Sequence, residues 1–223
     1  MFSNDDMASL SALLKSRAPL SPQEKTPHIG SDNEVNDPSA HIIRDDDIFL
    51  KRHVGVREAS VLVPLVERED EYFVLLTKRG NHLPDHPGQV CFPGGSREPI
   101  DQDDIATALR ETEEEVGIGA EFINIIGALI PYHTVTGFRV SPIVGIIRPE
   151  FSLEIDKNEV DTVFEVPLTY FLDRANHVKK SHKYKGEVRH FFAMTYNDYY
   201  IWGATAAMLV NLAHTLKAHV GDN

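Results

Sequence analysis

The sequence predicts an α/β domain in which a mixed β-sheet lies between helices. Two apolar, β-prone segments precede a strongly patterned helix, further β-prone segments follow it, and a second helix ends the chain. Strands on both sides of a central helix, together with a terminal helix, are typical of a sheet covered on both faces. The chain has 223 residues, of which 42% are hydrophobic, and this is enough apolar material for such a core.

The first 50 residues are predicted to form an N-terminal extension, and we expect the domain itself to span residues 51–223. Residues 7–15 (MASLSALLK) can form a short amphipathic helix with its leucines on one side. Residues 18–47 are rich in Pro, Ser, Asp and Asn and show no periodic apolar pattern. This composition indicates a flexible linker without a core of its own.

The regular pattern begins near Ala59 with a β-hairpin. The segments ASVLVPLV (59–66) and YFVLLTKR (72–79) are apolar and β-prone, and a short polar stretch separates them. A loop rich in glycine and proline follows, GNHLPDHPGQVCFPGG, and it ends at Gly95.

The strongest helix signal covers residues 101–116. Asp101 is suited to cap the N-terminus of this helix, and Gly117 is suited to end it. An apolar stripe recurs along it at helical spacing. The stripe consists of Ile105, Ala108, Leu109, Thr112 and Val116.

Four later segments have the composition of strands, and a helix follows the last of them. The strands are predicted in FINIIGALI (122–130), VSPIVGII (140–147), TVFEVPL (162–168) and EVRHFFAMTY (187–196). The terminal helix is predicted in ATAAMLVNLAHTLKAHV (204–220).

The composition excludes several classes of protein. A formal net charge of -12 repels nucleic-acid backbones and anionic membranes, so we expect neither as a partner. Cys91 is the only cysteine, which rules out an internal disulfide and fits a reducing compartment. No apolar run approaches the ~18 residues of a membrane span, and the acidic N-terminus is unlike a secretory signal. We therefore expect a cytoplasmic protein; a homodimer is compatible with the sequence, which fixes no oligomeric state.

Glu111, Glu114 and Glu115 lie on one face of the predicted helix, at positions i, i+3 and i+4. Like-charge pairs at this spacing cost about 0.2–0.5 kcal/mol each. A bound divalent cation would convert this cost into affinity, and hard Mg²⁺ or Mn²⁺ takes oxygen ligands of this kind. The alternative is a solvated acidic surface, because most runs of charge have no ligand.

The residues around this cluster resemble a known motif. GGSREPIDQDDIATALRETEEEVGI (94–118) resembles the Nudix box, G-x5-E-x7-R-E-U-x-E-E-x-G-U, in which U is a bulky apolar residue. The residues that match are Gly95, Arg110, Glu111, Glu114, Glu115, Gly117 and Ile118. Asp101 stands where the motif has its first Glu, one extra residue precedes Arg110, and Thr112 replaces the bulky apolar residue.

The resemblance extends to one branch of the Nudix superfamily. LLTKRGNHLPDHPGQVCFPGG (75–95) resembles the signature before the box in the coenzyme A pyrophosphatase (diphosphatase) branch. VTGFRVSPIVGII, NEVDTVFEVPL and IWGATA are similar to other segments of that branch, so the likeness covers about residues 59–216. Where the branch usually has an Arg in its signature, this chain has Pro84.

The resemblance implies a Nudix-type α/β/α sandwich and a metal-dependent hydrolase. Such an enzyme cleaves a nucleoside diphosphate derivative by attack of water on phosphorus, and here the implied substrate is coenzyme A or a derivative. Its products would be 3′,5′-ADP and a 4′-phosphopantetheine species. Alternatives are another diphosphate substrate, such as ADP-ribose or a dinucleotide, and a non-catalytic domain that binds nucleotides.

The resemblance also assigns roles to residues of the box. It implies Glu111, Glu114 and Glu115 as ligands of Mg²⁺ or Mn²⁺, with Arg110 orienting these carboxylates. The general base is either a Glu of the box, Glu111 or Glu115, or a Glu in a later loop. Glu159 is the first candidate in that loop, and Asp161 is the second.

Substrate-binding roles are expected of glycines and of local cations. Gly94 and Gly95 either let the backbone approach the metal site or simply form a turn. Arg79 either reaches a phosphate or forms a surface ion pair. In an acidic chain, the 3′-phosphate of coenzyme A needs cations close to the site. The candidates are Arg79, Lys78, Arg97 and Arg139.

Overall fold

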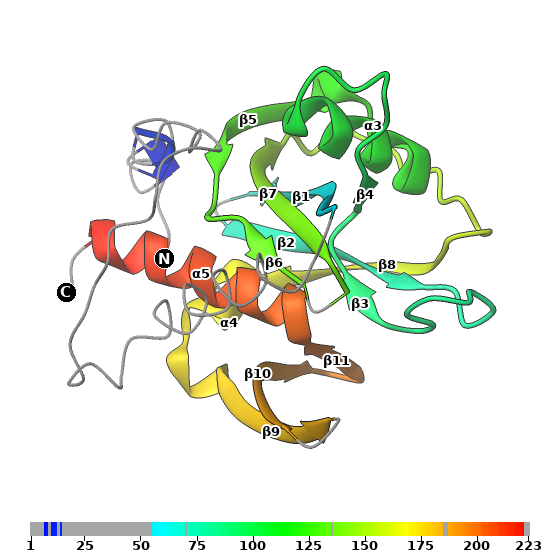
Figure 1. Cartoon of the computed structure of the whole chain (residues 1–223). Coiled ribbons are helices and arrows are strands. Elements are labelled where there is room, and N and C mark those ends of the chain that lie inside the picture. The colour runs from blue at the N-terminus through cyan, green and yellow to red at the C-terminus, as the bar shows by residue number, and fades with distance from the viewer. Residues whose placement is uncertain are drawn as a thin grey trace.

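The structure, a computed structural model, describes residues 7, 8, 10–12, 14, 55–69, 71–134, 136–184 and 187–220. Within these residues an eight-stranded sheet forms the centre of the molecule (Figure 1). Its strands are β1 (Arg57–Arg68), β2 (Glu71–Arg79), β3 (Val90–Cys91), β4 (Gly94–Ser96), β5 (Ile123–Ala128), β6 (Tyr132–His133), β7 (Phe138–Ile147) and β8 (Val160–Pro167).

The sheet is mixed, as the sequence predicts. β1 and β7 pair in parallel from Arg57↔Phe138 to Val66↔Ile147, and the other strand pairs of this sheet are antiparallel. β1 and β2 form the expected hairpin, whose turn includes Glu69 at a positive φ of 50°. Because β2 also pairs with β8, the end of the hairpin lies beside the segment that carries Glu159.

Helices cover both faces of this sheet, which confirms the α/β/α sandwich (Figure 1). Helix α3 (Asp104–Val116) lies on one face, where Ala108 and Val116 pack with Leu62 and Ile143 of the sheet. Helix α5 (Gly203–Val220) lies on the other face, together with the short α4 (Leu168–Leu172).

Helix α3 begins later and is rotated relative to the sequence prediction. Asp103, and not Asp101, caps it by accepting a hydrogen bond from the Ala106 amide, while Gly117 ends it at a φ of 76° as expected. Ile105 is 38% exposed. The residues that are buried instead are Thr107, Ala108, Thr112, Glu115 and Val116. The predicted apolar stripe is therefore wrong at Ile105, because packing turned Thr107 and Glu115 inward.

The structure also contains a second, three-stranded sheet, of which the sequence predicted one strand, and several short elements that it did not predict. The three-stranded sheet consists of β9 (Val178–Tyr184), the predicted β10 (Glu187–Tyr196) and β11 (Tyr199–Trp202). Its Phe192, Met194 and Ile201 are buried in the same core as α5. Two 3-10 turns complete the described elements, η1 (Ala120–Phe122) and η2 (Arg174–Asn176).

The described part of the N-terminal extension contributes to the core. Met7, Leu10 and Leu14 are helical, are at most 3% exposed, and belong to the hydrophobic cluster that includes α5. Leu14 lies so close to Gly127 that a side chain at position 127 would clash with it. Leu13 and the predicted linker at 18–47 lie outside the described residues, and the division at residue 50 stays a prediction.

Among the helices that the structure describes, each is too short or too polar to span a membrane.

Candidate active site

Glu111 and Glu115 lie one turn apart on α3 and face the glycines of β4. The side chain of Glu115 is only 3% exposed, and its Oε2 accepts a hydrogen bond of 3.2 Å from the Gly94 amide. The Glu111 carboxylate packs against Gly95, where an added Cβ would lie 2.5 Å from the carboxylate atoms. A side chain at position 95 would therefore displace the Glu111 carboxylate from β4.

Glu114 points elsewhere. Its side chain is 60% exposed and its Oε2 forms an ion pair of 2.8 Å with Arg110. Among the described residues, no three His, Cys, Asp or Glu side chains stand together as a preformed metal site. Of the three predicted ligands, the structure brings Glu111 and Glu115 together and leaves Glu114 on the adjoining, more exposed side of α3.

Arg110 connects the carboxylates of the box. Besides Glu114, it forms an ion pair of 3.0 Å with Glu111. Its Nε and Nη2 donate to both oxygens of Asp101, at 2.9 and 3.0 Å. Asp101 also accepts hydrogen bonds from the hydroxyl of Thr107 and the amide of Glu98. The residue predicted as a helix cap therefore anchors the arginine that holds two candidate ligands.

Arg79, at the end of β2, is the cation closest to the buried carboxylate. Its Nη1 lies 3.9 Å from Oε1 of Glu115, which is longer than a hydrogen bond. Its buried Nε has no hydrogen-bond partner among the described residues. The Arg79 guanidinium thus lies beside Glu115 without a close ion pair, and its predicted role on a phosphate stays a prediction.

Among the carboxylates of the site, Glu111 and Glu114 are paired with Arg110, whereas Glu115 has no close ion pair. Burial, together with the negative charges of Glu111 and Glu159, raises the pKa of Glu115 to about 8. Burial also raises the pKa of Glu111, although Arg110 acts in the opposite direction. The negative charge of Glu159 contributes to both shifts. Its turn is held near α3 and β2, because the Asp156 amide donates to the Glu115 carbonyl and the Gly80 amide donates to the Glu159 carbonyl.

These residues fit a hard divalent cation. The donors are carboxylate oxygens, which Mg²⁺ and Mn²⁺ prefer. A buried carboxylate beside two others is costly unless a positive charge balances it, and Arg79 stands too far away for a close pair. A cation held by Glu111 and Glu115 would supply that charge.

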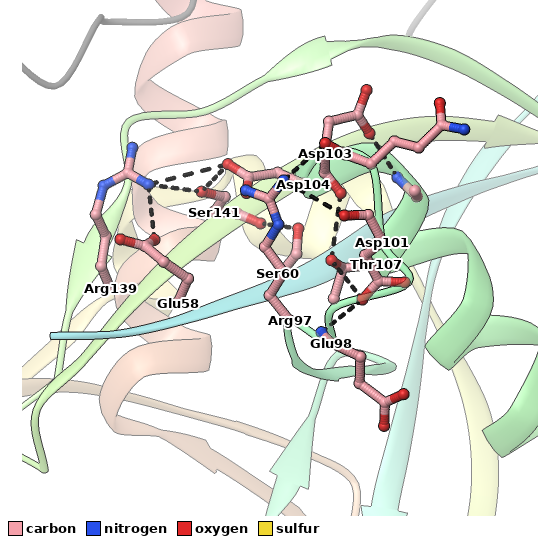
Figure 2. A network of polar contacts seen from close by, with 12 residues as sticks. Glu58, Ser60, Arg97, Glu98, Asp101, Asp103, Asp104, Thr107, Arg139 and Ser141 are labelled. Atoms are coloured by element: carbon pink, nitrogen blue, oxygen red, sulfur yellow. Dashed lines mark hydrogen bonds and ion pairs between the residues drawn. The ribbon is translucent and has the colours of Figure 1, made fainter.

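The other predicted cations are occupied. Arg139 forms an ion pair of 3.0 Å with Glu58 and lies 3.9 Å from Asp104 (Figure 2). Arg97 lies 3.7 Å from the other oxygen of Asp104 and donates to the Gln102 carbonyl at 2.7 Å. These contacts tie the start of α3 to β1 and β7, and the structure gives neither arginine a contact with Glu111 or Glu115.

Lys78 and Cys91 also have local roles in the structure. Lys78 lies 3.4 Å from Asp161, so the second candidate base is already paired. Burial raises the pKa of the Cys91 thiol to about 11, and its sulfur lies 3.1 Å from the Thr77 hydroxyl. Cys91 is thus a protonated packing residue, as its apolar neighbours in the sequence indicate.

Comparisons with known proteins identify the family of this chain. The NUDIX domain family profile matches residues 56–207. The chain is 44% identical over 157 residues to a protein of Enterobacter sp. (strain 638) named as an uncharacterized Nudix hydrolase, NudL, covering 70% of this chain and 81% of the relative. NudL of Escherichia coli (strain K12) is 41% identical over the same coverage.

Among solved structures, a NUDIX hydrolase from Alicyclobacillus acidocaldarius is similar with a TM-score of 0.48 and 19% identity, covering 75% of this chain and 95% of that protein. The family profile and the NudL relatives, taken with the box residues described above, establish that this chain belongs to the NUDIX domain family and is a Nudix hydrolase.

Proposed function

We propose that this protein is a divalent-metal-dependent pyrophosphohydrolase that cleaves the diphosphate of coenzyme A or a derivative of it. The observation that carries the proposal is the pair Glu111 and buried Glu115 beside Arg79, with the turn of Glu159 held next to the end of α3. The sequence likeness to the coenzyme A pyrophosphatase branch supports the choice of substrate.

In this proposal the carboxylates of α3 hold the cation, Arg110 orients the carboxylates, and Arg79 binds a phosphate. Glu111 and Glu115 would hold Mg²⁺ or Mn²⁺, with Glu114 available from the exposed side of the helix. The cation, when bound, would neutralise charge that develops on the phosphate oxygens. Arg110 keeps Glu111 and Glu114 oriented, and Arg79 donates to a substrate phosphate.

Glu159 acts as the general base in the proposed reaction. It takes a proton from the attacking water, whose oxygen forms a bond to one phosphorus of the diphosphate. The bridging P–O bond breaks, and the departing phosphate keeps the electron pair. From coenzyme A the two products are 3′,5′-ADP and 4′-phosphopantetheine. Glu159 is an exposed group, whereas Glu115 is buried and accepts a hydrogen bond from Gly94.

Recognition of the 3′-phosphate is assigned to Arg79. Lys78, Arg97 and Arg139 form ion pairs with Asp161, Asp104 and Glu58, whereas the Arg79 guanidinium lies 3.9 Å from Glu115 and is the least closely paired cation of this group. One charge-assisted hydrogen bond is worth about 1.5–3 kcal/mol. We therefore expect coenzyme A to have a kcat/KM about tenfold to a hundredfold above that of dephospho-coenzyme A.

A substrate panel tests this proposal. The purified full chain is incubated with coenzyme A, dephospho-coenzyme A, ADP-ribose and a dinucleoside polyphosphate, each with Mg²⁺, with Mn²⁺ or with EDTA. Equal rates on the first two compounds would remove recognition of the 3′-phosphate. Faster cleavage of ADP-ribose would favour a different diphosphate substrate, and undiminished turnover in EDTA would refute the metal requirement.

The variant Arg79→Met tests the assigned cation. The preference for coenzyme A over dephospho-coenzyme A should fall towards unity in this variant, because the extra phosphate loses its partner. Arg174→Met, at an exposed arginine of η2, is the matched control and should keep the preference. Retention of the preference in Arg79→Met would assign recognition to another residue.

A further inference from the structure

The loop that follows β2 is fastened to the turn that carries Glu159. The Gly80 amide donates a hydrogen bond of 2.9 Å to the Glu159 carbonyl. Two residues further on, Nε2 of His82 lies 2.9 Å from the carbonyl oxygen of Asn158. Because a carbonyl can only accept, the His82 Nε2 carries the proton and donates it. Two successive carbonyls of the turn are thus held by one short stretch of the facing loop.

Glycine at position 80 allows this arrangement. The His82 ring folds back over Gly80 so closely that a Cβ at position 80 would lie 2.5 Å from Cε1 of the ring. A side chain there would push the imidazole away from Asn158. We call Gly80 and His82, with their two hydrogen bonds to the turn, the clasp.

The rest of the turn depends on its own short-range contacts. Asp156 accepts hydrogen bonds from the Asn158 amide and side chain, both at 2.9 Å, and its carbonyl accepts from Glu159 and Val160. These bonds close the turn without fixing its position relative to α3. The Asp156 amide donates to the Glu115 carbonyl, which fixes the beginning of the turn, and the clasp fixes its end at Glu159.

We propose that His82 is a positioning residue for hydrolysis, because its clasp holds the Glu159 turn next to the end of α3 that carries Glu111 and Glu115. The inference rests on the role of Glu159 in the proposed function. His82 itself is exposed, bonds to the backbone of the turn, and touches no reacting atom in this scheme. Its effect is on the geometry of the catalytic groups, where a displacement of about 1 Å can cost on the order of a hundredfold in rate.

Kinetics of His82→Ala give the first test. We expect kcat to fall by about tenfold to a hundredfold, with KM changed by less than about twofold, because Arg79 and the glycines still bind the substrate. His82→Gln, which keeps a donor of similar reach, should recover part of the loss. Asp85→Ala, at an exposed position of the same loop, is the matched control and should keep the parent kcat. An unchanged kcat in His82→Ala would overturn the proposal.

Hydrogen exchange in the metal-free protein gives a second readout that needs no turnover. His82→Ala should accelerate amide exchange at Gly80 and at Asn158–Val160, with the core of the sheet unaffected. Asp85→Ala should leave the same amides unchanged. If these amides exchange at the parent rate in His82→Ala, the clasp does not hold the turn and the proposal fails.

A double-mutant cycle separates this inference from the proposed function. If His82 acts through Glu159, His82→Ala should have no further effect on kcat in a Glu159→Gln background, whereas independent effects would multiply. The assay uses whichever diphosphate compound is cleaved fastest, so a wrong choice of substrate leaves the cycle interpretable. Full activity of Glu159→Gln alone would overturn the role of His82 while leaving the metal site at Glu111 and Glu115 standing.

Discussion

Glu115 is the residue whose environment departs furthest from that of an ordinary surface carboxylate. It is buried, it receives one amide hydrogen bond from Gly94, and its pKa is raised to about 8 because burial and two neighbouring carboxylates disfavour the charge. Without a cation, this group costs stability when it is ionised. A buried carboxylate that destabilises the metal-free protein when it is ionised, but that suits a bound cation, is typical of a functional site.

The variant Glu115→Gln separates function from stability. We expect a loss of at least about a hundredfold in kcat with Mg²⁺, because a group that positions metal and water is gone. In EDTA at a pH above about 8, where Glu115 of the parent is ionised, the variant should unfold at the parent temperature or above it, since a buried charge has been removed. Glu113→Gln, on the exposed side of α3, is the control. Near-parent turnover in Glu115→Gln would refute the metal assignment, and clear destabilisation would make the carboxylate structural.

Asp101 presents the opposite case, a buried carboxylate that is fully compensated. Arg110 holds the pKa of Asp101 well below its usual range, with help from the hydrogen bonds of Glu98 and Thr107. The folded-state pKa is therefore lower than the unfolded value of about 3.9. The stability that this pair contributes is present in full above the unfolded-state pKa. It is lost as the pH falls from the unfolded-state pKa to the folded-state pKa of Asp101.

We accordingly predict that Asp101→Asn lowers the free energy of unfolding by about 1.5–3 kcal/mol at pH 7, where one charge-assisted bond is lost. Urea unfolding at pH 7 and near pH 3 measures the difference. The difference in the free energy of unfolding between parent and variant should be smaller at the lower pH. Asp85→Asn, an exposed carboxylate, should show no such difference at either pH. A difference that does not depend on pH would contradict the ion pair.

At the scale of elements, α3 depends on a cap that differs from the expected one. Asp103 has extended backbone angles, and its Oδ1 accepts a hydrogen bond of 2.8 Å from the Ala106 amide. This frees Asp101 to turn inward to Arg110. The start of the helix at Asp104 also places Asp104 between Arg97 and Arg139 (Figure 2).

The cap is testable by two substitutions at one position. Asp103→Ala should lower the free energy of unfolding by about 1 kcal/mol, because the Ala106 amide loses its acceptor. Asp103→Asn retains an acceptor and should stay within a few tenths of a kcal/mol of the parent. The measurement is equilibrium unfolding in urea. Equal effects of the two substitutions would mean that the side-chain bond does not carry the cap.

At the scale of the whole molecule, residues far apart in the sequence complete one core. The cluster beneath α5 includes Leu14 near the N-terminus, Ile126 and Leu129 after the central helix, and Leu216 near the end. Gly127, at a φ of 148°, lies where the register of β5 against β7 shifts, and this position accepts Leu14 against the strand. The family profile begins only at residue 56, so Leu14 lies outside the part of the chain that the profile matches.

Leu14→Ala measures the contribution of this N-terminal contact. Leu14 is 1% exposed, and truncating a buried leucine costs about 2–5 kcal/mol. We expect a loss in that range, with parent-like kcat at a temperature where the variant is folded. Ala12→Ser, at an exposed helical position, is the control and should be near neutral. No loss of stability in Leu14→Ala would mean that the segment detaches from the domain in solution.

Local patterns were sufficient for many parts of the fold. The β1–β2 hairpin, α3 with its end at Gly117, β5, β7, β8, β10 and α5 all lie where apolar periodicity and turn residues predict them. β9 and β11 were not predicted, because VKKSHKY and YYIW lack a clear period and are strands through pairing with β10. A short strand is decided by its neighbours as much as by its own sequence.

Residue spacing within one element was enough to predict the central helix, its cluster of glutamates and the glycines that precede it. Packing in the folded chain sets which glutamate is buried, which is paired with Arg110, and which arginine lies beside the buried carboxylate. The physical reason is that the rotation of α3 about its axis is set by packing against the sheet. The observed rotation buries Thr107 and Glu115 and places Glu114 where it forms an ion pair with Arg110. The local spacing of residues does not specify that rotation.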